Sequence, residues 1–468
     1  MPSLRKDTII KTLPGERFTP FALADKLNAR VILESAAFSR GRSRYSILMV
    51  KEAFRVVQKN DDIYVEEQGR QRRIRNGGKD ILDVLAYFSD QHEMPDCGIP
   101  FPAGGIGFLS FEFSRMCDTI HFQLKDDPLD LPDALFLFGH VFVIFDHFSD
   151  MIYLAGLNYK EQEIDLVKAI DETEQKINDL NFNYLAPKVN SYSAEIINGE
   201  EGKQDYLKAV ETIREEIIKG NLLQAVPSRR LTVKTDLPAL EAYRRLRSTN
   251  PSPYLFYIDF TDFQLFGSSP EVHLKIQDGR ALVRPIAGTR RRGKNAGDDK
   301  LLENELLADP KEGAEHLMLV DLGRNDLGKI CRSGSVEVTE YKTIERYSHV
   351  MHIVSQVEGD LENGKTTADA IRATFPAGTV SGAPKIQAIE TISKIEKFPR
   401  RFYAGMIGII EPGGNMDSCI TIRSALKKDG FIYLQAGGGI VYDSTPEREF
   451  EETGEKLRAL ASALGVEV

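Results

Sequence analysis

The sequence predicts an α+β fold, in which strands and helices do not alternate strictly along the chain. Residues 1–160 contain short strand candidates separated by turns, and residues 160–181 are polar and helix-like. Later, stretches with helical periodicity are separated by uneven numbers of strand candidates. A doubly wound parallel sheet requires regular alternation, so we expect a mixed α+β architecture instead.

The composition is typical of a soluble globular protein, with 42% hydrophobic and 28% charged residues among 468. Seventy acidic against sixty basic residues give a net charge of −10, which disfavours a nucleic-acid or anionic-membrane binder. The four cysteines are far apart, without a C-x-x-C pair, so we expect neither a zinc cluster nor disulfides. No apolar stretch reaches the roughly 20 residues of a membrane-spanning helix, and the N-terminus lacks a secretory apolar region. These features predict a cytoplasmic protein.

The first half of the chain ends in a predicted linker. Its longest apolar stretch, Ala134 to Phe148, is rich in Phe, Val and Ile and predicts a buried strand. The stretch from Phe182 to Gly202 is rich in Pro, Asn, Ser and Gly, which is typical of a linker. We therefore expect an N-terminal region at 1–181, a linker at 182–202 and a second region at 203–468.

The second region has three strong helix signals. Tyr206 to Ile217 carries apolar residues at helical spacing, and Gly220 is placed to end that helix. A helical region from Asp299 to Asp326 is broken at Asp309-Pro310, where Asp309 can cap the second helix. The final helix opens at Ser444-Thr445-Pro446 and ends at Gly465. Strands are expected at Leu222–Val233, Arg346–Val357, Tyr403–Ile410, Ser418–Ala425 and Phe431–Gln435.

Two predicted helices each carry a Glu-x-x-Glu pair: Glu312 with Glu315, and Glu449 with Glu452. This spacing places both carboxylates of a pair on one helix face, and two such faces together could bind Mg²⁺. From spacing alone, solvated helix faces are the commoner explanation. Glu312 could also close a capping box after Asp309.

Two glycine-rich segments, Ala377–Lys385 and Gln435–Ser444, would let backbone amides approach an anion closely. Neither matches a dinucleotide or P-loop motif, so no nucleotide is expected. The basic run Arg290–Lys294 is typical of a solvated loop, and His349 and His352 are out of phase for a shared metal site. The residues alone thus predict an α+β protein with a candidate Mg²⁺ site for an anionic substrate.

Several long motifs, in order along nearly the whole chain, resemble the chorismate-utilising enzymes, most closely the anthranilate synthase component I family. The matching segments are Val31–Ala36, Gly220–Arg230, Asn250–Tyr257, Gly267–Glu271, Arg284–Gly293, Leu306–Ile330, Arg346–Gly359, Phe375–Lys385 and Gly437–Thr453. The resemblance implies the family's large α+β fold, with packed sheets surrounded by helices. It also implies a mostly-β, regulatory N-terminal region folded against the catalytic region.

The resemblance implies a role for many individual residues. Glu315 and Glu452 match direct Mg²⁺ ligands, and Glu312 and Glu449 match supporting carboxylates. Glu271 matches the general acid for the C4 hydroxyl of chorismate, His352 a histidine near that hydroxyl, and Thr379 a pocket residue. The substrate-binding positions are matched by Gly288, Thr289, Tyr403, Arg423, Gly437, Gly439 and Lys456.

Two positions distinguish the branches of the family. Members that add water at C2 carry a lysine where this chain has Gln224, and aminodeoxychorismate synthases carry a lysine nucleophile where it has Ala287. The resemblance therefore implies ammonia as nucleophile, and anthranilate and pyruvate as products. The alternatives are 2-amino-2-deoxyisochorismate synthase, aminodeoxychorismate synthase component I and a non-catalytic tryptophan-sensing subunit.

The resemblance also implies a partner and an inhibitor. No cysteine lies in a G-x-C-x-G motif, so ammonia would come from a separate glutaminase subunit in a heterodimer or heterotetramer. Feedback inhibition by tryptophan is implied, with Ile32 and Leu255 as conservative departures from the usual pattern. The matching inhibitor-pocket positions are Leu33, Glu34, Ser35, Asn250, Pro251, Ser252, Pro253, Tyr254, Leu255 and Cys419.

Overall fold

The computed structural model describes residues 7–36, 44–67, 69–75, 77–179, 181, 191–347 and 350–468. Residues 182–190 of the predicted linker therefore lie outside the described residues, as does His349. Among the described residues, no helix combines the length and the apolar character needed to cross a membrane.

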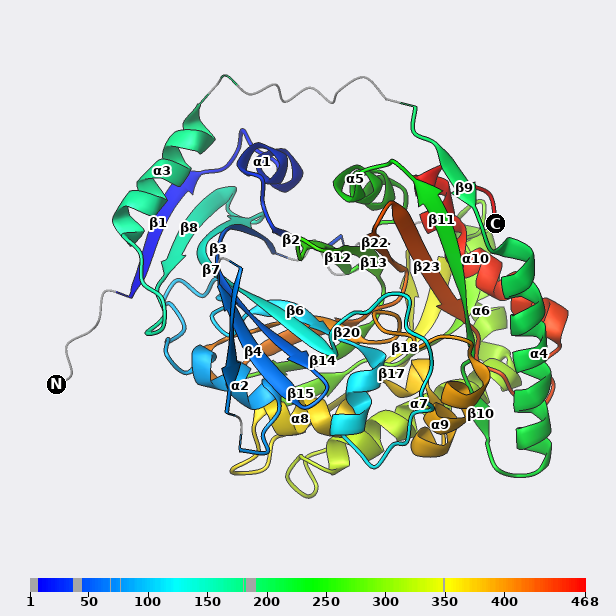
Figure 1. Cartoon of the computed structure of the whole chain (residues 1–468). Coiled ribbons are helices and arrows are strands. Elements are labelled where there is room, and N and C mark those ends of the chain that lie inside the picture. Colours follow the sequence, from blue (N-terminus) through cyan, green and yellow to red (C-terminus); the bar gives the residue numbers. More distant parts are fainter. Residues whose placement is uncertain are drawn as a thin grey trace.

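The strands form an antiparallel network with a stem and two arms (Figure 1). The stem comprises β1 (Thr8–Pro14), β3 (Tyr45–Lys59), β4 (Asp62–Glu67), β5 (Arg70–Ile74), β7 (Ala134–Asp146) and β8 (Met151–Leu157). The first arm begins with β2 (Val31–Glu34) beside β3 and continues through β12 (Tyr254–Asp259), β13 (Gln264–Ser269), β22 (Ser424–Lys428), β23 (Phe431–Gly437), β11 (Ser228–Thr235) and β9 (Ala194–Ile196). The second arm begins with β6 (Ile106–Leu109) beside β7 and continues through β20 (Met406–Ile410), β21 (Met416–Ile420), β14 (Val272–Gln277) and β15 (Arg280–Val283) to β18 (Val350–Asp360). Strand β18 also pairs with β16 (Ile286–Arg291) and with β17 (Glu337–Arg346).

Helices lie outside the two arms (Figure 1). The helices near the first arm and the stem are α1 (Pro20–Leu27), α3 (Leu166–Asn178), α4 (Gly199–Ile218), α5 (Ala239–Thr249) and α10 (Pro446–Leu464). Those near the second arm are α2 (Ile81–Ser89), α6 (Ala296–Ala308), α7 (Pro310–Gly328), α8 (Thr367–Thr374) and α9 (Lys385–Ile395). Short 3₁₀ turns are η1 (Phe111–Met116), η2 (Gly378–Val380) and η3 (Pro412–Gly414), and a separate two-stranded ladder pairs β10 (Gln224–Ala225) with β19 (Gly382–Ala383).

The two arms pack face to face. Buried side chains of β12 and β13, such as Phe256 and Leu265, share one apolar core with Leu274 of β14 and Ile407 of β20. The other face of the first arm packs, through residues such as Phe266, against α5 and α10 in a second core. The predicted architecture of packed sheets with helices outside is thus confirmed.

The two halves of the chain share these arms. Strand β2 of the N-terminal half pairs with β12, and β6 pairs with β20. The division at residues 181 and 203 stays a prediction, because these ladders cross it.

Several local predictions are confirmed. Residues 134–146 form the fully buried strand β7. Asp309 caps α7 by accepting hydrogen bonds from the amides of Lys311 and Glu312, with Pro310 at the first helical position. Gly220 follows α4 with a positive φ of 79°, and Gly465 ends α10 in the left-handed conformation.

Other local predictions are wrong for identifiable reasons. The expected strand Leu222–Val233 is split into β10 and β11, with Pro227, which lacks an amide donor, between them. The expected strand Ser418–Ala425 is interrupted at Arg423, whose φ is +51°. Tyr403 lies in a turn before β20, and Arg346 closes β17 whereas Val350 opens β18. Glu312 does not close a capping box, since its carboxylate pairs with Arg290 at 3.4 Å.

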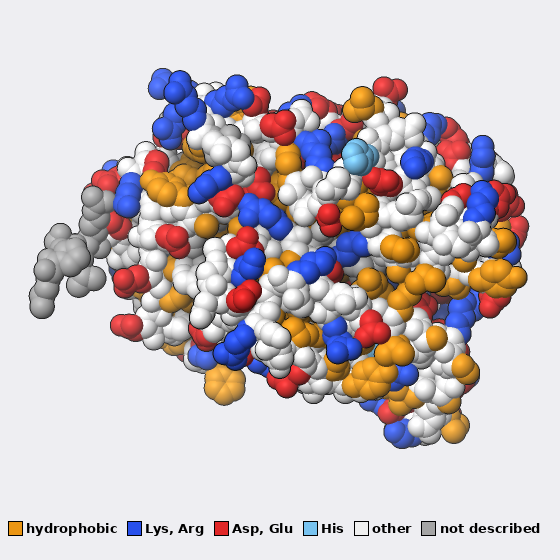
Figure 2. All heavy atoms as spheres, turned by 90° about the horizontal axis from the view of Figure 1, so that it is seen from below, with side chains coloured by type: hydrophobic (Ala, Val, Ile, Leu, Met, Phe, Trp, Pro, Cys, Tyr) orange, Lys and Arg blue, Asp and Glu red, His pale blue; other side chains and the backbone are white. Residues whose placement is uncertain are grey.

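The surface agrees with the acidic but mixed composition. Figure 2 shows Lys and Arg side chains interspersed with Asp and Glu over the lower face of the molecule, with scattered apolar groups. That face therefore lacks the continuous basic stripe that nucleic-acid binding favours.

Candidate active site

The candidate site lies where the chain crosses between the two arms. Glu271 lies on the crossover from β13 to β14, and Arg423 lies on the crossover from β21 to β22. Because both crossovers are at the same end of the packed arms, two residues 152 positions apart in the sequence influence each other electrostatically. The chain topology therefore brings an acid and a guanidinium into one site.

Glu271 is a buried carboxyl with a strongly shifted pKa. Burial raises its pKa from 4.5 to about 7, against the opposing influence of Thr379, the Arg423 and Lys456 charges and the Ile286 amide. The Thr379 hydroxyl is itself buried and makes no hydrogen bond of ordinary geometry within the described part of the chain. A carboxyl with a pKa near neutrality can hold a proton and release it, as a general acid must.

His352 on β18 has one ring nitrogen fixed by the neighbouring strand. Its Nδ1 lies 3.1 Å from the Gly288 carbonyl oxygen and 3.0 Å from the Thr289 hydroxyl. Since a carbonyl only accepts, Nδ1–H is the donor and Nε2 is left as an acceptor in the neutral ring. Burial lowers the pKa of His352 to about 4, so the ring is neutral at physiological pH.

Arg423 is a guanidinium without a hydrogen-bond partner among the described residues. Burial lowers its pKa, whereas the nearby Tyr403, Glu452 and Glu271 oppose that change. Tyr403 is 3% exposed, and its hydroxyl lies beside the Gly437 backbone. An unpaired, largely buried guanidinium is a fitting partner for a substrate carboxylate.

Lys456 fixes the end of β23 against α10. Its Nζ donates to the Gly437 carbonyl at 2.8 Å and pairs with Glu452 at 2.7 Å. The predicted substrate-binding residues from β23 and α10 are thus brought together, while Thr289 is at the exposed edge of β16.

The two Glu-x-x-Glu pairs approach each other across the backbone of Gly438 and Gly439. A Cβ on Gly438 would lie 3.0 Å from Glu449 Oε2 and 4.0 Å from Glu452 Oε1, and one on Gly439 would lie 3.5 Å from Glu315 Oε1. The glycines therefore leave room in which carboxylates of α7 and α10 converge. Glu312 lies nearer the start of α7 than Glu315, with its Oε2 beside Gly288.

Within the described residues, no three His, Cys, Asp or Glu side chains are gathered tightly enough to hold a metal ion as they stand. The donor chemistry nevertheless suits Mg²⁺. Burial and then Glu312 raise the pKa of Glu315, and burial and Glu452 raise that of Glu449. Lys456 lowers the pKa of Glu452 and keeps that carboxylate charged. A hard divalent cation would relieve the repulsion among these oxygens, so the residues fit the predicted ion.

The two residues that distinguish the family branches both lie at this site. Gln224 is 3% exposed, and its Nε2 donates to Glu315 Oε1 at 3.2 Å. Ala287 is buried on β16 and pairs with Ile353, next to His352. Neither position supplies a base or a nucleophile.

The predicted inhibitor segments lie side by side. Strand β2 pairs with β12 so that Glu34 is opposite Leu255, and the Ala36 amide donates to the Ser252 carbonyl at 3.0 Å. The Glu34 carboxylate accepts from Tyr243 at 2.7 Å and from Arg247 at 2.6 Å, so its charge is already paired.

The other predicted inhibitor positions lie near this ladder and contact β13 and β21. The side-chain amide of Asn250 donates a hydrogen bond to the Ser268 hydroxyl on β13, and the Tyr254 hydroxyl donates one to Asp417 at 2.6 Å. Cys419 is 1% exposed on β21, within electrostatic reach of Tyr254. Sequence reasoning thus placed these segments together correctly, and tryptophan binding there stays a prediction.

Sequence reasoning missed two tyrosines of the site. Tyr347 lies edge-on to the His352 ring, with centroids 5.5 Å apart, and donates to Glu345 at 2.9 Å. The Tyr206 hydroxyl is buried near Glu449 and Glu452 and lacks a hydrogen-bond partner in the described structure. Tyr206 is one of the apolar positions of the α4 periodicity, which gave no sign of the polar role of its hydroxyl.

Two cavities lie away from this site. One, of about 350 Å³, is lined by Asp321, Arg324, Asn325 and Val336, and another, of about 410 Å³, lies between α2 and the loop before α8. Neither is lined by the carboxylates, histidine or arginine described above, so neither is the candidate active site.

Comparison with known proteins places this geometry in a family. The family model for chorismate binding enzymes matches residues 36–462. The chain belongs to the chorismate-binding enzyme family. It is therefore a chorismate-utilising enzyme with the α+β fold of that family.

Family members named anthranilate synthase component 1 are similar over almost their whole length. The protein of that name from Spirochaeta aurantia is 59% identical over 464 residues, covering 99% of this chain and 96% of that relative. The one from Acetivibrio thermocellus is 38% identical, covering 92% and 89%. The crystal structure of anthranilate synthase component I from Streptococcus pneumoniae TIGR4 superposes with a TM-score of 0.80 at 33% identity, covering 97% of this chain and 98% of that one.

Proposed function

We propose that the protein is component 1 of an anthranilate synthase, a lyase that starts tryptophan biosynthesis. It converts chorismate and ammonia into anthranilate, pyruvate and water. Its 59% identical relative bears that name. The observation that carries the proposal is a combination of residues: the site contains a buried acid, Glu271, and it has Gln224 and Ala287 at the two positions where other branches use lysine.

In this proposal Glu271 donates its proton to the C4 hydroxyl as that group leaves, while ammonia forms its bond at C2. Neutral His352 directs Nε2 toward the same hydroxyl. Arg423 binds a substrate carboxylate, supported by the Tyr403 hydroxyl and the backbone near Gly437. Loss of the enolpyruvyl group as pyruvate then gives the aromatic product.

Glu315 and Glu452 would hold Mg²⁺ directly, with Glu312 and Glu449 in support. When bound, the ion would supply Lewis-acid polarisation and neutralise a carboxylate of the substrate. Without it, the site would place anionic chorismate against four carboxylates, which explains why the reaction would depend on the ion.

The ammonia donor would be a separate glutaminase subunit, since free ammonia is mostly protonated at neutral pH. The name component 1 of the relatives supports a two-component enzyme. We expect this heteromer to be cytoplasmic, because all four cysteines are free thiols and a reducing compartment keeps them so. Tryptophan would inhibit it by binding at the β2–β12 ladder, with residues 1–181 as the regulatory region.

The deciding experiment is incubation of the purified protein with chorismate, Mg²⁺ and an ammonium salt. Fluorescent anthranilate and pyruvate should appear in equal amounts, and EDTA should abolish both. Loss of chorismate without either product would refute the proposal and favour a 2-amino-2-deoxyisochorismate synthase.

A further inference from the structure

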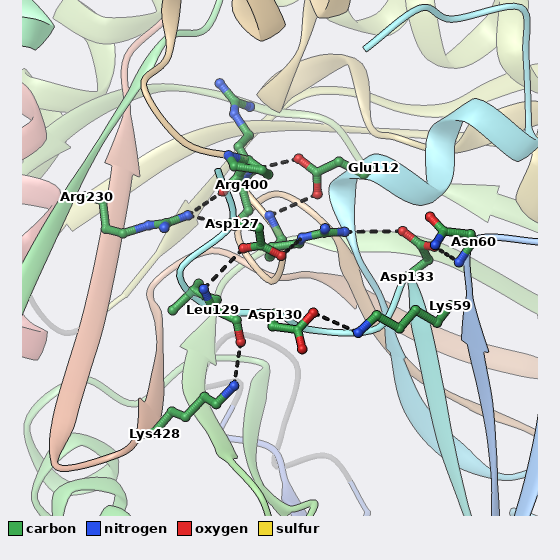
Figure 3. Close-up of polar contacts among 12 residues, drawn as sticks. Lys59, Asn60, Glu112, Asp127, Leu129, Asp130, Asp133, Arg230, Arg400 and Lys428 are labelled. Atoms are coloured by element: carbon green, nitrogen blue, oxygen red, sulfur yellow. Dashed lines mark hydrogen bonds and ion pairs between the residues drawn. The ribbon is translucent and has the colours of Figure 1, made fainter. Parts of the chain in front are cut away.

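A residue of the N-terminal half holds the turn that carries Tyr403. Glu112 of η1 accepts hydrogen bonds from the amides of Arg400, at 2.8 Å to Oε1, and Arg401, at 3.0 Å to Oε2. In the same place the Phe111 amide donates to the Arg401 carbonyl at 2.8 Å. Figure 3 shows the Glu112 carboxylate directed at this turn. Both of its oxygens are therefore occupied by main-chain donors of residues about 290 positions away.

The turn requires such support because its backbone is unusual. Arg401 has a φ of +55° and Ala404 a φ of +60°, a conformation that side chains with a Cβ rarely adopt. Burial raises the pKa of Glu112, but the Arg401 charge and the amides of Arg400 and Arg401 oppose that change and favour the ionised carboxylate. An ionised carboxylate accepts stronger hydrogen bonds from amides than a neutral acceptor does. Glu112 thus stabilises a backbone shape that the local sequence does not favour.

The Arg400 side chain connects this turn to the candidate site. Its Nη1 donates to the Val380 carbonyl at 2.8 Å and its Nη2 to the Val226 carbonyl. The guanidinium lies between the Phe111 ring, at 4.6 Å, and the Tyr403 ring, at 5.5 Å. Val380 is adjacent to Thr379, and Val226 lies two residues from Gln224. One side chain thus fixes the three segments that carry Tyr403, Thr379 and Gln224.

Glu112 is not needed to neutralise Arg400. Glu396 already pairs with the Arg400 guanidinium at 2.7 Å, and both side chains are almost fully buried. The contacts of Glu112 are with the main chain of the turn, so its contribution is to position backbone atoms. Removing it would leave the Arg400–Glu396 pair in place but release the turn that orients it.

We propose that Glu112 is a positioning residue for the reaction, which sets the place of the Tyr403 hydroxyl and the Thr379 loop against chorismate. This inference rests on the proposed function. It gives the N-terminal half a direct part in building the catalytic pocket, separate from the predicted inhibitor segments.

The test compares Glu112→Gln with Asp127→Asn by steady-state kinetics. Asp127 is the matched control, because it accepts from the Nε of Arg401 in the same turn, at 2.7 Å, without contacting the main chain of that turn. We expect Glu112→Gln to raise the KM for chorismate about tenfold and to lower kcat, since small displacements of positioning groups are costly. Asp127→Asn should keep the wild-type KM even where its melting temperature falls.

The KM value separates positioning from mere stabilisation. A partly unfolded enzyme has fewer active molecules and a lower apparent kcat, but its KM is unchanged. Glu112→Asp, which retains the charge and reaches one amide, should give an intermediate KM and decides the matter if Glu112→Gln does not fold. Wild-type KM in either folded variant would overturn the inference, whereas a wild-type protein that forms no anthranilate would refute the proposed function instead.

Discussion

At the scale of single residues, the site depends on pKa values that burial has moved in opposite directions. The pKa of Glu271 is raised to about 7 and that of His352 is lowered to about 4, so the candidate site contains an acid and a neutral histidine at physiological pH. In water the usual values of these groups would make the carboxyl fully ionised and the histidine partly charged. The fold therefore reverses the ordinary roles of the two side chains.

The Glu271 pKa predicts how the rate depends on pH. The active form is protonated, so kcat at a fixed concentration of free ammonia should fall as pH rises through about 7. Glu271→Gln should lower kcat by about 10²- to 10⁴-fold and remove this dependence. The measurement is a kcat profile between about pH 5 and pH 9, roughly two units on each side of the shifted pKa. A profile that is the same in the variant would exclude Glu271 as the acid.

A substitution at Glu452 tests the predicted Mg²⁺ site. Glu452→Gln should abolish Mg²⁺-dependent turnover, because it removes one charged oxygen ligand. Binding of tryptophan, measured by calorimetry, should persist, since the β2–β12 ladder is elsewhere. Glu451→Gln, on an exposed side chain of the same helix, is the control and should behave like wild type. Normal turnover in Glu452→Gln would contradict the metal assignment.

At the scale of elements, the β2–β12 ladder joins two segments more than 200 positions apart. Its register places Glu34 opposite Leu255, and this pairing brings Ser35 next to Asn250–Pro253. A substitution at Ser35 should therefore affect the predicted inhibitor segments without changing the candidate active site around Glu271.

Ser35→Ala should weaken tryptophan inhibition about tenfold, because it removes one hydrogen-bonding hydroxyl worth about 1 to 1.5 kcal/mol. The uninhibited rate should change by less than about twofold, as expected for a substitution outside the site. Both follow from anthranilate formation measured against tryptophan concentration. An unchanged inhibition constant would place the inhibitor site elsewhere.

At the scale of the whole molecule, strand ladders and a shared core join the two halves of the chain. The ladders β2–β12 and β6–β20 cross from one half to the other, and the core between the arms contains Phe108 as well as Phe263. Separating the halves would expose that core.

A fragment of residues 191–468 should therefore lack a cooperative thermal transition and aggregate, because a large apolar surface would face water. Scanning calorimetry of the fragment and of the full chain provides the measurement. A soluble fragment with its own sharp transition would show instead that the second half is an independent domain.

Local features were the ones that could be predicted from the sequence. The cap at Asp309, the stop at Gly465 and the buried strand at 134–146 all depend on neighbours within a few residues. Strand ends were less predictable. Arg423 breaks its strand because the chain must cross between arms there, and no local signal marks that crossover.

The sequence by itself determined the family and the order of its motifs, and it predicted the acids, the histidine and the arginine of the candidate site. Only the tertiary structure decided that burial holds Glu271 near neutrality, that Arg423 lacks a partner among the described residues, and that Glu112 supports the turn of Tyr403. The physical reason is the distance along the chain between the residues on which each feature depends. Caps and periodicity depend on adjacent residues, whereas burial and hydrogen bonding across the arms depend on groups that the fold brings together from distant parts of the chain.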